Sequence, residues 1–194
     1  MMMAQIQQKE DKLNLAPKKF VMWLIVFSSF MVFAALTSGF IVSSGSKVHA
    51  LATKLPGIFL FSTITIALSS LTMFLGSKAA GLLQLAKQRM FLWLTIALGI
   101  VFFILQVYGW GELIKMGVYF VNPNSSQSFI YVFTGVHLLH ILAGVLLLVN
   151  ALIKSYRNVA QVKNLYYMEI SGIFWHFVDI IWIYLYVFLL LNQN

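Results

Sequence analysis

The fold of this chain is decided around the stretch Trp175-His176-Phe177-Val178-Asp179-Ile180-Ile181-Trp182-Ile183-Tyr184-Leu185-Tyr186. It places His176 and Asp179 three residues apart, in the middle of an apolar run that is long enough to cross a membrane. An ionised Asp at the centre of such a helix costs roughly 2.5–3.5 kcal/mol on insertion scales. The pair therefore needs either a partner within the protein or a function.

The composition extends this conclusion to the whole chain. Of its 194 residues, 61% are hydrophobic and 9% are charged, whereas a soluble protein carries about 25% charged residues. Five runs almost without Asp, Glu, Lys or Arg each reach the ~20 residues that a spanning helix needs. Because hydrocarbon offers no partner to backbone N–H and C=O groups, each run must form a helix.

We therefore predict an all-α, polytopic membrane protein with a single five-helix transmembrane domain, residues 20–194. A flexible cytoplasmic segment, residues 1–19, is expected to precede it, because nothing apolar at its start can hold it to the bundle. The predicted helices cover about 20–43, 55–77, 90–111, 128–153 and 168–191.

The basic residues predict the orientation of this bundle. The formal net charge is +8, but no basic segment is long enough to track a nucleic-acid backbone, so we expect no nucleic-acid partner. With five spans, ten Lys and Arg residues fall on one side of the membrane and three on the other. The ten are Lys9, Lys12, Lys18, Lys19, Lys78, Lys87, Arg89, Lys154, Arg157 and Lys163, and the three are Lys47, Lys54 and Lys115. The positive-inside rule then predicts a cytoplasmic N-terminus and a periplasmic C-terminus.

Two narrow polar stripes lie on the last two predicted helices. At 100° per residue, the residues of each stripe share one side of their helix. One stripe contains His137, His140 and Gly144, and the other contains Glu169, Gly172, His176 and Asp179. A short basic loop makes the two helices antiparallel neighbours, and we expect another helix to approach closely over Gly144. We expect His176 and Asp179 to be satisfied by each other, by the histidines of the preceding helix, or by backbone groups of neighbouring helices.

Three interpretations of these polar groups remain open on the residues alone. A metal site from His137, His140 and Asp179 is conceivable by ligand type, but two axial haem ligands on different helices are harder to assemble, because two of the histidines share one helix. A proton relay of buried Asp, Glu and His would suit a small proton-coupled transporter, although the chain shows no inverted repeat. The interpretation that we favour is structural, with interhelical hydrogen bonds of roughly 0.6 kcal/mol each.

The chain lacks the features of an independent enzyme. It has no cysteine, which excludes disulfides, thiolate metal sites and iron–sulfur clusters. It also has no Gly-rich phosphate loop and no nucleophile with a base at a useful spacing. These features fit an integral subunit of a larger complex.

Two motifs resemble subunit III of the haem–copper oxidases (cytochrome c and quinol oxidases). They are Glu169-x6-His176-Phe177-Val178-Asp179-x2-Trp182-x2-Leu185-Tyr186 and Phe133-Thr134-Gly135-Val136-His137-Leu138-Leu139-His140-x3-Gly144. The resemblance extends from about residue 20 onward. It implies the short, five-helix bacterial form of that family, in which subunit III binds no haem or copper itself. The family's motif residues here are His137, His140, Glu169, His176, Asp179 and Trp182, with no catalytic, cofactor-binding or metal-binding role implied for them.

The resemblance also implies a function and a set of partners. We expect a non-catalytic subunit of a respiratory terminal oxidase in the bacterial plasma membrane, a complex that reduces oxygen to water and translocates protons. The chain would stabilise subunit I and support proton uptake, with haem and copper in subunits I and II, with phospholipid bound, and with a larger respiratory supercomplex left open. The alternatives are a subunit-III-like protein that accompanies nitric oxide reductases, and the small proton-coupled transporter.

Two positions depart from the family pattern. Where the family has a Ser-Glu pair in the first of these helices, this chain has Ser28-Ser29, and Gly109 stands where a Gln-x-x-Glu-aromatic pattern has its acid. A proton-uptake role that depends on those two carboxylates is therefore in question for this chain.

Overall fold

The described part of the chain forms five long helices. The computed structural model describes residues 2–45, 51, 53–121, 125–157 and 160–193, and only the backbone of residues 2–14 and 16. The helices are α1 (Met2–Ser43), α2 (Ile58–Gly81), α3 (Leu85–Lys115), α4 (Ser125–Tyr156) and α5 (Gln161–Leu191). All five are long and apolar enough to cross a membrane, which confirms the predicted five-span, all-helical fold.

The helices extend beyond the apolar runs that predicted them. α3 begins five residues before the predicted start at residue 90, and α5 begins seven residues before residue 168. Each apolar run marks only the part of its helix that must be apolar in lipid, and the helix continues with polar residues into the interface. α1 begins at Met2, well before the predicted start at residue 20, and contains Pro17 in its interior. The predicted flexibility of residues 1–19 stays a prediction.

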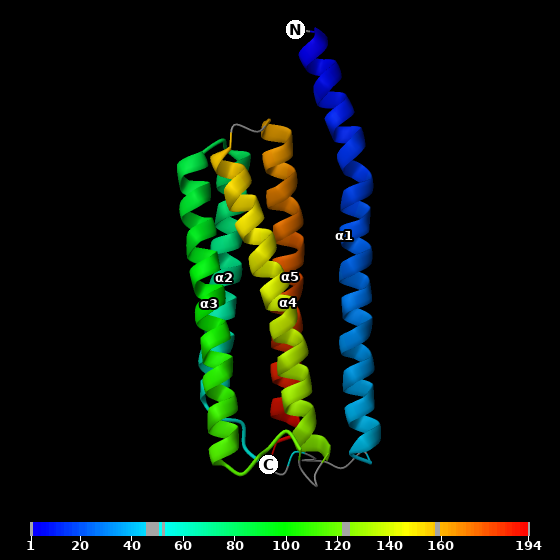
Figure 1. Ribbon diagram of the computed structural model, residues 1–194, viewed down its shortest axis with the longest axis vertical. Helices are drawn as coiled ribbons and strands as arrows, with labels where there is room; N and C mark the ends of the chain where they lie inside the picture. The colour runs from blue at the N-terminus through cyan, green and yellow to red at the C-terminus, as the bar shows by residue number, and fades with distance from the viewer. Residues whose placement is uncertain (1, 46–50, 52, 122–124, 158–159, 194) are drawn as a thin grey trace.

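The helices divide into a four-helix body and one peripheral helix. α2 and α3 form a tightly packed antiparallel pair, and α4 and α5 complete the body beside them (Figure 1). Within the described part of the chain α1 packs only on α4 and α5, and its N-terminal end extends past the rest of the bundle (Figure 1). The start of α1 and the end of α5 lie at opposite ends of the bundle (Figure 1), as an odd number of spans requires.

Trp175 forms the centre of the four-helix body. Its ring is fully buried against two glycines on different helices. A Cβ atom added to Gly99 of α3 would lie 2.8 Å from Trp175 Cη2, and one added to Gly144 of α4 would lie 2.9 Å from Trp175 Cε3. The indole Nε1 donates a hydrogen bond of 3.1 Å to Ser69 Oγ of α2. One side chain of α5 thus contacts all three other helices of the body, and the close approach expected over Gly144 is made by this ring.

Candidate functional site

The polar stripe of α5 faces α2. Gly172 of the stripe lies against Met73 and Ser77 of α2, because a Cβ atom there would be 3.4 Å from Met73 Cε and 3.6 Å from Ser77 Oγ. His176 of the same stripe bonds to Ser70 of α2. The sequence correctly placed the stripe residues on one side of the helix, but the helix that they face is α2 rather than α4.

His176 has a hydroxyl as its partner. Its Nδ1 lies 2.7 Å from Ser70 Oγ. From the sequence we expected Asp179, a histidine of α4 or a backbone group instead, and this expectation is wrong for Nδ1. Ser70 belongs to a row of serines and threonines on α2 that the sequence alone associates with helix packing. The sequence gives little indication that Ser70 bonds to His176, because the periodicity of one helix does not show which neighbouring helix a residue faces.

Asp179 lies about one turn after His176 on α5, and it is 3% exposed. Neither of its carboxylate oxygens has a hydrogen-bond partner among the described protein atoms. The Ser70 hydroxyl lies near this carboxyl, but its hydrogen bond in this structure is to His176. A buried carboxyl without a partner is costly unless it is protonated or bound to water.

Glu169 is the stripe residue that lies nearest the N-terminal end of α5. Its carboxylate forms an ion pair with Lys19 Nζ of α1, and both side chains are partly exposed. Ser77, Glu169, Gly172 and His176 line an open cavity of about 430 Å³. The stripe therefore extends from an exposed ion pair, through a hollow, to a buried carboxyl.

His137 lies in an aromatic box at the centre of the bundle. It is fully buried, and its ring centroid lies 4.9 Å from that of Trp182, 5.7 Å from that of Phe102 and 6.3 Å from that of Phe33. Neither ring nitrogen has a hydrogen-bond partner within the described residues. Trp182 is held in turn by a 3.0 Å hydrogen bond from its Nε1 to Thr63 Oγ1.

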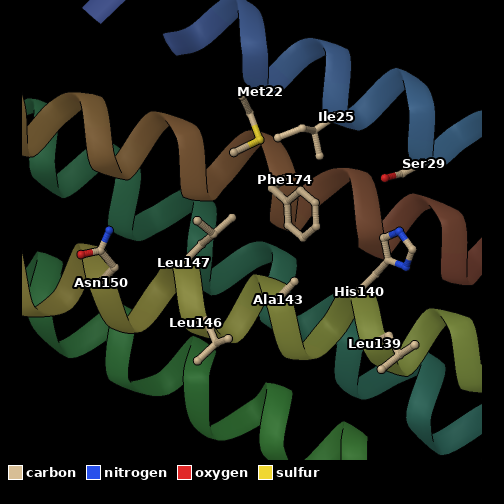
Figure 2. A pocket seen from close by; sticks show the side chains of 10 residues that line it. All are labelled: Met22, Ile25, Ser29, Leu139, His140, Ala143, Leu146, Leu147, Asn150 and Phe174. Carbon is tan, nitrogen blue, oxygen red and sulfur yellow. The ribbon is translucent and has the colours of Figure 1, made fainter.

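His140 lies about 60° around α4 from His137 and beside α1, with its ring centroid 5.1 Å from that of Phe33. Its Nδ1 is 2.8 Å from the carbonyl oxygen of Val136, one turn earlier. The ring lines a groove of about 550 Å³ between α1, α4 and α5. Figure 2 shows Ser29 of α1 and His140 of α4 directed into this groove beside Phe174.

The metal-site interpretation has no support in this geometry. Among the residues that the structure describes, no three His, Cys, Asp or Glu side chains come together as metal ligands. His137 is enclosed by rings, His140 faces α1, and Asp179 faces α2. The three side chains proposed as one ligand set thus have three different environments.

The two positions that lack the family's acids have different surroundings. A Cβ atom at Gly109 would lie 3.2 Å from Phe59 Cε2 and 3.3 Å from Ile58 Cγ2, so α2 occupies the place of an acidic side chain there. Ser29 instead lines the open groove opposite His140 (Figure 2). A larger side chain would have room only at Ser29.

Comparison with known proteins gives one consistent result. Residues 4–192 match the family described as cytochrome c oxidase subunit III. The chain is similar to the cytochrome bo(3) ubiquinol oxidase subunit 3 of Buchnera aphidicola subsp. Acyrthosiphon pisum, with 27% identity over 94% of this chain and 90% of the relative.

It is also similar to two proteins named cytochrome c oxidase subunit 3. The one from Bacillus sp. (strain PS3) is 22% identical over 84% of this chain and 80% of its own length. The one from Thermostichus vulcanus is 33% identical over 66% of this chain and 62% of its own length. Both the family match and these relatives cover most of the five-helix fold.

Proposed function

The chain belongs to the cytochrome c oxidase subunit III family, and we propose that it serves as the non-catalytic subunit III of a respiratory haem–copper terminal oxidase. The observation that carries this proposal is the family match over residues 4–192, which includes all five spanning helices. The complex would reduce oxygen to water and conserve the energy as a proton gradient. The chain would stabilise the catalytic subunit and support its proton uptake.

The environments of the histidines support a non-catalytic role. A six-coordinate haem needs two imidazoles on different helices directed at one iron, whereas His137 is enclosed by Trp182, Phe102 and Phe33. His140 and His176 are each hydrogen-bonded through Nδ1 to a separate group. Haem and copper would accordingly belong to subunits I and II.

The apolar surface supports a place in a membrane complex. Large apolar side chains such as Phe20, Trp23, Phe27 and Phe30 of α1 are more than half exposed. Partner helices and phospholipid would cover surfaces of this kind. We assign the chain to the bacterial plasma membrane, with the ends of α2 and α4 that carry Lys78 and Lys154 in the cytoplasm.

Affinity purification from a mild detergent tests the proposal. We expect the tagged chain to elute together with a large haem-bearing partner that consumes oxygen. Stripping the chain from the complex should leave all haem and copper on the partner, as measured by absorption spectra and metal analysis.

Two other results would overturn it. A complex that reduces nitric oxide and not oxygen would indicate the nitric-oxide-reductase-associated relative. A chain that elutes alone, carries no haem partner and catalyses proton flux in liposomes would indicate a transporter.

A further inference from the structure

We propose that Asp179, Ser70 and His176 form a proton- and water-binding site inside the membrane, open to the aqueous phase through the cavity beside Glu169. The site is independent of the proposed function, because it is formed by side chains of α2 and α5 of this chain alone. Its ligands are water and the exchangeable proton of a carboxylic acid.

Asp179 forms the inner end of this site. The other two acidic residues with described side chains, Glu112 and Glu169, lie near helix ends and are each paired with a lysine. Asp179 lies ten residues beyond Glu169 on the same helix, which is ~15 Å at 1.5 Å per residue. With 3% exposure and no hydrogen-bond partner for either oxygen among the residues that the structure describes, it requires a bound proton, a bound water molecule, or both.

Ser70 and His176 connect Asp179 to the cavity. A hydroxyl has one donor and two acceptor positions, so Ser70 can bond to His176 Nδ1 and to a second group at the same time. The Asp179 carboxyl is an ionisable group that lies near Ser70. Imidazole has two ring nitrogens that can exchange a proton, and His176 is also a lining residue of the cavity. The order from the inside outward is therefore Asp179, Ser70, His176 and the cavity.

The cavity supplies the water. Its volume of about 430 Å³ is enough for several water molecules at ≈30 Å³ each. Ser77, Glu169 and His176 provide polar groups along its wall. The rest of the lining is Leu165, Met168, Gly172 and Ile173, all of α5.

The charged and titratable groups around the site are few. From α1, Lys19 reaches only the outer end, where it pairs with Glu169. α2 contributes the neutral hydroxyls of Ser70 and Ser77. The histidines of α4 lie elsewhere, with His140 beside Phe174 and His137 beside Trp182.

Infrared spectroscopy of the purified complex tests the site. The wild type should show a carboxylic-acid C=O band that is absent from Asp179→Asn, and this band should shift during transfer to D₂O. In Ser70→Ala and His176→Phe the shift should be slower by about tenfold, which corresponds to ~1.4 kcal/mol in the barrier. Ser70→Thr, which retains the hydroxyl, should exchange at the wild-type rate.

Ser62→Ala is the matched control. Ser62 is a fully buried serine on the same helix, but its hydroxyl accepts a hydrogen bond from Gln106 Nε2 of α3. Its removal should leave the exchange rate unchanged. The proposal fails if the wild type has no Asp179 acid band, if that band does not exchange, or if Ser70→Ala and His176→Phe exchange as fast as the control.

Discussion

The helices of the four-helix body pack more closely on one another than α1 packs on the body. In the body, Trp175 packs against two glycines, and polar side chains form hydrogen bonds across the interfaces of α2 with α3 and α5 and of α4 with α3 and α5. The side chains of α1 make two interhelical polar contacts within the described residues, the Lys19–Glu169 ion pair and a 3.0 Å hydrogen bond from Tyr184 Oη to Thr37 Oγ1. In its most apolar stretch, 28% of the residues of α1 are buried, against 44% in α5.

The body and α1 are therefore held in place by different interactions. The body specifies its own packing through shape and hydrogen bonds, because helices in lipid gain no hydrophobic driving force from association with each other. α1 is placed mainly by ring contacts of Phe33 and Phe40, and a groove separates part of it from α4 (Figure 2). We therefore expect substitutions in the body to affect global stability, and substitutions at α1 to affect only its attachment.

The largest effect is expected from Gly144→Val in the body. A Cβ atom there would lie 2.9 Å from Trp175 Cε3, and overpacking of this kind costs typically 1–3 kcal/mol. Unfolding by SDS in mixed micelles, followed by the circular dichroism of the helices, would measure the loss. Gly135→Val on the same helix is the control, because nothing lies within 4 Å of a Cβ atom at that position. Equal losses in both variants would show that valine affects the helix itself rather than the contact with Trp175.

The second predicted loss of stability concerns the buried amide pair of Gln88 and Asn164. Each side chain donates a 3.0 Å hydrogen bond to the other across α3 and α5. Gln88→Leu should destabilise the body by roughly 1–3 kcal/mol, because it leaves the buried Asn164 amide without its partner.

A double-mutant cycle sharpens this prediction. Gln88→Leu combined with Asn164→Leu should recover most of the loss in the same unfolding measurement, since both unpaired polar groups are then removed. Additive losses would mean that the two amides are not coupled.

The smallest effect is expected from Lys19→Gln at the attachment of α1. Because the ion pair with Glu169 is partly exposed, its loss should cost ~0.2–1 kcal/mol. Spin labels on α1 and α5 should report a broader distance distribution, while the unfolding midpoint of the body stays the same. Lys18→Gln, at the neighbouring exposed lysine, should leave the distance distribution unchanged. A lowered midpoint in Lys19→Gln would show that α1 is part of the cooperative body.

The sequence predicted which segments form helices better than it predicted which helices pack against each other. The five spans follow from a demand that lipid makes on every backbone group, so composition was sufficient to find them. Helical periodicity correctly placed Glu169 and Asp179 on one side of α5, but periodicity carries no information on which helix that side meets. The partners Ser70 and Asn164 were missed for this reason, because each is an ordinary polar residue until folding brings it to His176 or Gln88.

The central position of α5 has a consequence for how the protein is made. α5 packs against α1, α2 and α4 and supplies both tryptophans that are buried within the described residues, yet it leaves the ribosome after the other four helices. Until it is inserted, α2, α3 and α4 lack the ring that joins them, and α1 lacks one of the two helices on which it packs. α1 therefore lacks both of the helices on which it packs until α4 is inserted, and one of them until α5 follows.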